Sequence, residues 1–260
     1  AGARQAEHLP LAVAPHMWRT PQQGPPAGMT AVNRVLFVGR SGFPDRDRFF
    51  AAADVDPTLL EEALALLEHG GRPDFFWWAT RTGIEVWPGH AVRRAGHGAE
   101  RCAAANRTRW LRAALPCGLT IHGDDDWRAR LASSSTEGGA LDLRPPVDYY
   151  TILPDLYAAA RCTLNVTSLL LPAGLTQRHF DVWAAGGFLL TDATPGLEIF
   201  PPELTREIAL AAPSELRPRL ERLERDPALR AHLQTAWRAH LRDRHTYARR
   251  MERVRERLGL

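Results

Sequence analysis

The stretch CTLNVTSLLLPAGLTQRHFDVWAAGGFLLT, residues 162–191, predicts a strand, a loop, a short helix and a second strand in direct succession. CTLNV and FLLT are apolar, β-branched runs of the kind that form strands buried on both faces of a parallel sheet. The residues between them predict a helix whose first turn contains Arg178. A strand–helix–strand unit forms a right-handed crossover, so we expect the two strands to lie parallel in one sheet.

The same alternation extends to both sides of this stretch. Further strands are expected at 34–39 (RVLFVG), 119–123 (LTIHG) and 206–211 (REIALA). Helices are expected after the Asp56-Pro57 start signal, over 99–114, from Asp126, around 150–160, and over 213–259 with breaks near Pro227 and 244–246. Residues 72–98, which contain the aromatic run FFWW, show no assignable pattern. The alternation predicts an α/β fold with a mainly parallel sheet covered on both sides.

Composition limits the class of protein. The chain has 260 residues, of which 45% are hydrophobic, and its formal net charge is +3. All of its Lys-plus-Arg count is Arg, spread along the chain among Asp and Glu, so we expect no nucleic-acid partner. No apolar run is long enough to span a bilayer and no signal-peptide pattern is present. The three cysteines are widely spaced, which favours a reducing cytoplasm.

The Pro- and Gly-rich residues 1–32 predict an extended entry segment, and residues 33–260 the folded domain. In open α/β sheets, ligands bind beyond the carboxyl ends of the strands. Those ends carry Gly39 to Gly42, the pair His122 and Gly123, Asn165 to Ser168, and the loop 171–178.

Arg178 is unusual because a cation in the first turn of a helix costs about 0.3–1 kcal/mol when nothing neutralises it. Its position therefore indicates an anion. Gly174 permits close approach by a ligand, Thr176 can cap the helix, and Gln177 stands beside them. Asp181 shares a helix face with Arg178 and can accept hydrogen bonds from sugar hydroxyls. The alternative is an ordinary surface ion pair between Arg178 and Asp181.

The loop VGRSGFPDRDR places Arg40, Arg46 and Arg48 near a strand end, where their guanidiniums could stabilise a leaving diphosphate. The alternative, slightly favoured by spacing alone, is a solvated loop in which Asp45 and Asp47 pair with these arginines.

His122 is either a contact to a nucleotide base or a hydrogen-bonded structural residue. Asp124-Asp125-Asp126 could hold a divalent metal ion through donor phosphates, but a carboxylate before a helix is more often its N-cap. The chain lacks the G-x-G-x-x-G, P-loop, H-E-x-x-H and G-x-S-x-G patterns, so nicotinamide and hydrolase chemistry are disfavoured and no cofactor or metal is expected.

The block PDLYAAARCTLNVTSLLLPAGLTQRHFDVWAAGGFLLTDATPGLEIF (154–200), with HLPLA (8–12), VLFVG (35–39) and HTYARRMERVRERL (245–258), resembles the CgeB-like, spore-maturation type of group-1 glycosyltransferases. The resemblance covers most of residues 8–52 and 107–260. It implies a GT-B architecture, in which two Rossmann-like domains face each other across a cleft. It also implies that this chain is the carboxyl-terminal, donor-binding half, so that the amino-terminal acceptor domain is missing.

The resemblance further implies that Asp181 contacts ribose or sugar hydroxyls, that Arg178 is the arginine preceding it, and that Arg40 and Arg46 face the diphosphate. Related retaining enzymes carry a second carboxylate where this chain has Ala173. The expected function is metal-independent transfer of a sugar from a nucleoside-diphosphate sugar to an acceptor. Two alternatives stay open: a non-catalytic nucleotide-sugar-binding or assembly module, and a metal-dependent transferase that uses Asp124–Asp126.

Overall fold

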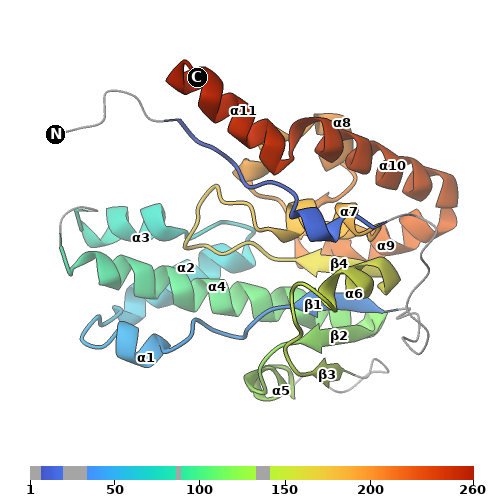
Figure 1. The fold of residues 1–260 in the computed structure, drawn as a ribbon. Helices are drawn as coiled ribbons and strands as arrows, with labels where there is room; N and C mark the ends of the chain where they lie inside the picture. Colours follow the sequence, from blue (N-terminus) through green and yellow to red (C-terminus); the bar gives the residue numbers. More distant parts are fainter. Residues whose placement is uncertain (1–6, 20–33, 86–88, 133–140) are drawn as a thin grey trace.

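A six-stranded, fully parallel sheet forms the centre of the protein (Figure 1). The structure is a computed structural model and describes residues 7–19, 34–85, 89–132 and 141–260. The strand order is β3-β2-β1-β4-β5-β6, so the order reverses between β1 and β4. The strands are β1 (Val35–Val38), β2 (Leu119–His122), β3 (Asp142–Arg144), β4 (Cys162–Asn165), β5 (Leu189–Asp192) and β6 (Ala209–Leu210).

Helices flank the sheet in a three-layer, Rossmann-like α/β arrangement, which confirms the expected fold class. They are η1 (Pro15–Met17), α1 (Arg46–Phe49), α2 (Pro57–Glu68), α3 (Phe75–Thr82), α4 (Val92–Ala114), η2 (Leu115–Cys117), α5 (Asp126–Leu131), α6 (Leu153–Ala159), α7 (Arg178–Ala184), η4 (Pro195–Ile199), α8 (Pro202–Thr205), η5 (Pro213–Glu215), α9 (Leu216–Arg225), α10 (Pro227–Arg244) and α11 (Tyr247–Leu258). Among the described residues, no helix has the length and apolar character needed to cross a bilayer.

The expected strands are all present, although REIALA contributes only Ala209–Leu210. Strand β3 was not predicted; it is a three-residue edge strand with an exposed arginine, Arg144. Short polar edge strands lack the apolar run by which buried parallel strands are found. The Ser/Gly-rich stretch SSSTEGG, residues 133–139, is typical of a linker and falls outside the described residues.

Helix boundaries follow local capping where the sequence contains a strong signal. The Asp56 carboxylate accepts hydrogen bonds from the N–H groups of Thr58 and Leu59, as expected for an N-cap before a proline. Likewise, Asp226 caps α10 and Thr246 caps α11, which produces the two expected breaks in the carboxyl-terminal helices. The helix expected over 99–114 begins earlier, at Val92.

The main core lies between the sheet and its surrounding helices, and α7 is the most enclosed of these. Residues 179–184 are all buried, because α10 covers the side of α7 that faces away from the sheet. Trp183 of α7 stacks on Trp237 of α10, with ring centroids 5.1 Å apart and planes 2° apart. Such aromatic pairs contribute about 0.5–1.5 kcal/mol beyond the burial of their surface.

The unassigned residues after α2 belong to a helical insert made of α2, α3 and the first half of α4. It has its own small core, in which Trp78 is 1% exposed and packs tightly against Gly98. A Cβ added to Gly98 would stand 2.3 Å from the Trp78 ring. Arg72 ties the insert to the sheet, because it donates to Asp192 at the end of β5 (3.0 Å) and to Thr167 after β4 (3.1 Å).

The described part of the entry segment, residues 7–19, packs against the carboxyl-terminal helices. We call residues 8–18 the strap. Ala12 and Met17 are 0% exposed, and the Val13 N–H donates to the His245 carbonyl oxygen at 2.9 Å. The Pro- and Gly-rich composition gave no indication of this packing, since the buried residues of the strap follow neither a helix nor a strand period.

Candidate functional site

Arg178 lies where the carboxyl ends of β1 and β4 diverge, which is the reversal point of the sheet. From the first turn of α7, its guanidinium donates to the Asn165 Oδ1 at the end of β4 (2.9 Å) and to the Val38 carbonyl oxygen at the end of β1. It also lies over the Phe37 ring, 5.7 Å from the centroid. Within the described residues no carboxylate lies within 4.0 Å of it, so the surface ion pair with Asp181 is not formed. Arg178 is thus fixed by neutral groups and keeps its charge uncompensated.

A buried polar network holds Asn165, the side chain that accepts from Arg178, in place. The Thr176 hydroxyl donates to Asn165 Oδ1 (2.9 Å), and the Asn165 amide donates to the Thr191 hydroxyl (3.1 Å). The Thr176 N–H donates to His179 Nδ1 at 3.0 Å. Burial lowers the pKa of His179 to about 4, so the ring is neutral and can accept this bond. Thr176 therefore does not cap α7 with its side chain, and its N–H group is already used within the protein.

Asp181 faces the interior. It is 1% exposed, and its carboxylate accepts hydrogen bonds from the Ala14 N–H (3.1 Å), the Gln177 amide (3.0 Å) and the Tyr149 hydroxyl (2.6 Å). Burial raises the pKa of Asp181, while these hydrogen bonds act in the opposite direction. Gln177 also donates to the Ala12 carbonyl oxygen (2.6 Å). Both residues thus hold the strap against α7, and in this arrangement neither offers a free group to a ligand.

The loop after β1 lines a cavity of about 480 Å³ together with residues from α5. Arg40 and Arg46 both reach this cavity, as do Arg48 and Arg130. Arg40 is exposed, and the described chain supplies no hydrogen bond or ion pair to it. Arg46 makes a contact of 3.3 Å with Asp47, which corresponds in part to the solvated-loop alternative. The structure thus brings the arginines of this loop into one cavity, next to the strand that Arg178 contacts.

Side chains from two other segments fix the backbone of this loop. The Ser41 N–H donates to Asp124 Oδ2 (2.9 Å), and the Phe43 N–H donates to Glu100 Oε1 (3.0 Å). Glu100 is 2% exposed and pairs with Arg107 at 3.2 Å. The sequence analysis missed Glu100 and Arg107, because a pair seven residues apart in one helix resembles any surface pair until the loop is placed against it.

The expected N-cap role of the aspartate run is not seen. Asp125 occupies the N-cap position of α5 without a side-chain bond, while Asp124 holds Ser41. Within the ranges that the structure describes, no three His, Cys, Asp or Glu side chains are grouped as metal ligands.

Gly123 and His122 support the loop from β2. A Cβ on Gly123 would stand 2.5 Å from the Gly39 carbonyl oxygen, which also accepts the Trp127 indole N–H at 2.9 Å. Only glycine permits this close approach of the β1 and β2 ends. His122 Nδ1 lies 3.0 Å from the Pro145 carbonyl oxygen, a hydrogen bond that matches the structural interpretation.

Gly174 belongs to a turn in which its N–H donates to the Leu171 carbonyl oxygen (3.0 Å). It lines a second cavity, beside the strap, and not the one formed by the loop after β1.

Comparison with known proteins agrees with this architecture. A family model described as glycosyl transferase-like matches residues 101–256, which is more than half of the chain. The matched range runs from α4 into α11 and includes Arg178, Asn165 and Asp124. No curated protein and no solved structure gave a match. With its parallel sheet, its reversal point at β1 and β4 and this match, the chain belongs to the glycosyl transferase-like family.

Proposed function

We propose that this chain is the donor-binding half of a GT-B glycosyltransferase of the CgeB-like type. The donor is a nucleoside-diphosphate sugar, whose diphosphate lies at the ends of β1 and β4. A separate amino-terminal domain supplies the acceptor site. The reaction breaks the bond between the sugar and the diphosphate, so the donor site must stabilise the negative charge that grows on the leaving diphosphate.

The observation that carries the proposal is the uncompensated charge of Arg178 at the reversal point of the sheet. Ligands of open α/β folds bind at this point. A guanidinium presents several N–H donors in a planar fork that suits phosphate oxygens. Two neutral acceptors, Asn165 and the Val38 carbonyl, orient Arg178 before any ligand arrives. The charge is therefore positioned in advance, which is how a site stabilises a transition state without reorganising.

Arg40 and Arg46 extend the positive charge along the loop after β1. Because Asp124 and Glu100 hold the backbone of this loop, the two arginines can approach the diphosphate from a fixed support. These guanidiniums supply the charge that a metal ion provides in other transferases, so the proposed mechanism needs none.

The proposal gives Asp181 a positioning role in place of the sugar contact that the family resemblance implies. Its carboxylate is satisfied by three donors of the protein, and a contact with ribose would require the strap to detach. Asp181 acts through the strap and Gln177, next to the start of α7.

Isothermal titration calorimetry with UDP-, GDP-, ADP- and dTDP-sugars tests this proposal. At least one of these nucleotide sugars should bind the wild-type protein. Arg178→Gln should weaken its binding roughly 10- to 100-fold, since hydrogen bonds to charged groups contribute about 1.5–3 kcal/mol. Arg40→Ala, at an exposed position, should weaken binding by about tenfold without altering the fold.

Arg225→Ala is the matched control, because this arginine is 78% exposed on α9 and lies on no cavity discussed above. Equal donor binding by wild type, Arg178→Gln and Arg40→Ala would show that the diphosphate does not bind at this site. Donor binding without sugar transfer, in a chain that includes the acceptor domain, would favour the non-catalytic alternative.

A further inference from the structure

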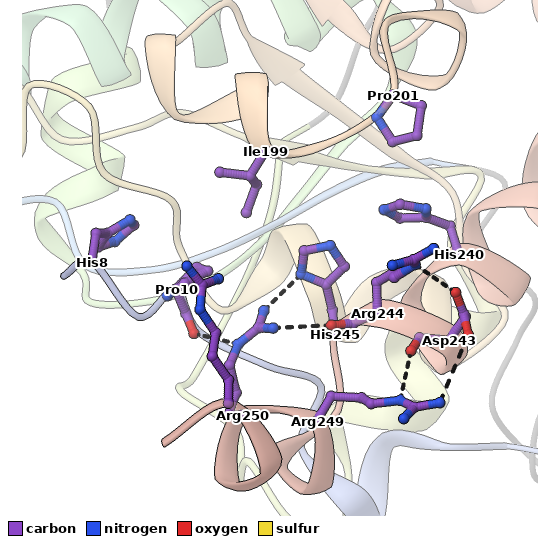
Figure 2. A pocket seen from close by; sticks show the side chains of 11 residues that line it. His8, Pro10, Ile199, Pro201, His240, Asp243, Arg244, His245, Arg249 and Arg250 are labelled. Carbon is purple, nitrogen blue, oxygen red and sulfur yellow. Dashed lines mark hydrogen bonds and ion pairs between the residues drawn. The ribbon is translucent and has the colours of Figure 1, made fainter. Parts of the chain in front are cut away.

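A further cavity of the described chain shares no lining residue with the cavity formed by the loop after β1. It has a volume of about 1090 Å³ and lies between the strap, the connection from η4 to α8, and the junction of α10 and α11 (Figure 2). We call it the basic groove. Its polar lining includes His240, Asp243, Arg244, Arg249, Arg250 and Arg253.

Positive charge exceeds negative charge in the basic groove. Four arginines line it against a single carboxylate, that of Asp243. Three of the arginines have a carboxylate neighbour, and the pairs are Arg244–Asp243, Arg249–Glu252 and Arg253–Glu7. One positive charge therefore remains even when every such partner is counted.

That remaining charge belongs to Arg250, which is only 7% exposed. Its guanidinium donates to the carbonyl oxygens of Pro10 (2.8 Å), Leu11 (2.8 Å) and Arg244 (3.0 Å), and to His245 Nδ1 (2.7 Å). No carboxylate of the described residues contacts it. A buried cation without a counter-charge is costly, so its retention points to an anion in the groove.

His240 supplies an independent sign of a ligand. It lines the basic groove, and its Nε2 is buried and has no hydrogen-bond partner among the described residues. Buried polar nitrogens nearly always have a partner, so a hydrogen-bonding group of a ligand is expected beside this ring. The neighbouring His245 accepts from Arg250 at Nδ1, so the proton of its neutral ring is on Nε2, on the side of the ring that faces the groove.

An apolar cavity continues from the basic groove. It has a volume of about 570 Å³ and shares His8, Pro10 and Ile199 with the groove. Three leucines on its lining are unusually exposed for their type, namely Leu9 (45%), Leu11 (43%) and Leu171 (58%). Exposed apolar side chains that gather around one hollow mark a binding surface.

We propose that the two cavities together bind one anionic amphiphile, a lipid phosphate whose phosphate lies in the basic groove and whose aliphatic chain lies along the leucines. The groove offers N–H donors and positive charge, which suit phosphate oxygens. The adjoining cavity offers apolar surface, and its burial under an alkyl chain adds affinity in proportion to chain length. The site is independent of the proposed donor site, with which it shares no residue.

Calorimetry on the full chain tests this proposal with octyl phosphate below its micelle concentration, inorganic phosphate and the uncharged octyl glucoside. Octyl phosphate should bind at least about tenfold more tightly than either of the others, because only it fills both halves. Inorganic phosphate binding equally well would make this a free-anion site, and octyl glucoside binding equally well would make it an unselective apolar surface. Either result would overturn the proposal.

Substitutions in each cavity test whether the basic groove binds the phosphate and the apolar cavity binds the alkyl chain. The double variant Arg249→Gln, Arg253→Gln should weaken octyl phosphate binding about tenfold, whereas Arg255→Gln, an exposed arginine of the same helix outside the groove, should leave it unchanged. Leu171→Ser should weaken binding of octyl phosphate but not of inorganic phosphate, and Leu258→Ser, 66% exposed on α11, is its control. Equal losses in the variants and their controls would refute the assignment. Nucleotide-sugar binding should be unaffected by all four, which separates this site from the donor site.

Discussion

Acidification should destabilise this protein well above the pH at which carboxylates titrate, because two histidines are buried in their neutral form. Burial, the largest cause in each case, lowers the pKa of His179 to about 4 and that of His245 to about 3. In the unfolded chain both return to about 6.5. Between the folded and unfolded pKa values the unfolded state binds more protons, so the free energy of unfolding decreases as the pH falls through this window.

The size of the effect follows from the same values. Each histidine should lower the free energy of unfolding by up to about 1.4 kcal/mol per pH unit, or about 2.5 kcal/mol between pH 7 and 4.5. The two together amount to about 5 kcal/mol, comparable to the whole stability of a marginal domain. The raised pKa of Asp181 acts in the opposite sense, because its protonation favours the folded state and offsets part of the loss.

Urea unfolding at several pH values between 7 and 4.5, followed by tryptophan fluorescence and circular dichroism, measures this slope. His179→Gln should remove about half of the slope, while His69→Gln, at an exposed position, should leave it unchanged. A free energy of unfolding that stays level from pH 6.5 to 4.5 would show that the two rings are not buried as neutral groups.

Three further outcomes are expected. Gly123→Ala should lower the free energy of unfolding by about 1–3 kcal/mol and weaken donor binding, because the new Cβ meets the Gly39 carbonyl oxygen. The control is Gly96→Ala, whose nearest contact is at 3.6 Å and which should be neutral or stabilising in thermal melts. Asp181→Ala leaves three donors without an acceptor and should cost on the order of 3–5 kcal/mol in urea unfolding, and an unchanged midpoint would contradict the buried network. Donor binding in calorimetry should be the same with and without EDTA, and its loss would return a metal role to Asp124–Asp126.

The parts of the fold that the sequence predicted are those with strong local causes. The apolar run at residues 35–38 forms a buried parallel strand, and the Asp56 side chain caps the helix that begins at Pro57. Within the helical insert, α3 was not predicted because the run FFWW lies in two environments: Trp78 is in a core, while Phe76 is 58% exposed. No single period describes such a run.

The candidate site likewise contains residues that the sequence could place and residues that it could not. The sequence could place Arg178 and Arg40 at strand ends, because the rule that locates ligands in α/β sheets needs only the strands. It could not show that Asp181 is enclosed, since this depends on Ala14 and Tyr149, which are distant in sequence and follow no shared pattern. The sequence around an aspartate on a predicted helix does not reveal whether its hydrogen-bond donors come from a bound sugar or from the protein itself.

The arginines of this chain differ in what holds them, and that difference distinguishes arginines paired with a carboxylate from Arg178, the arginine that we propose binds the donor. Arg72 is paired with Asp192 and Arg107 with Glu100, so their charges are neutralised inside the protein and they serve to join segments. Arg178 is held by a carbonyl and an amide oxygen, which orient a guanidinium without cancelling its charge. An approaching anion therefore meets almost the full charge of Arg178, whereas it would first have to displace a carboxylate from Arg72 or Arg107. Because neutral partners do not repay the loss of hydration, such a cation is stabilised fully only when its anion is bound.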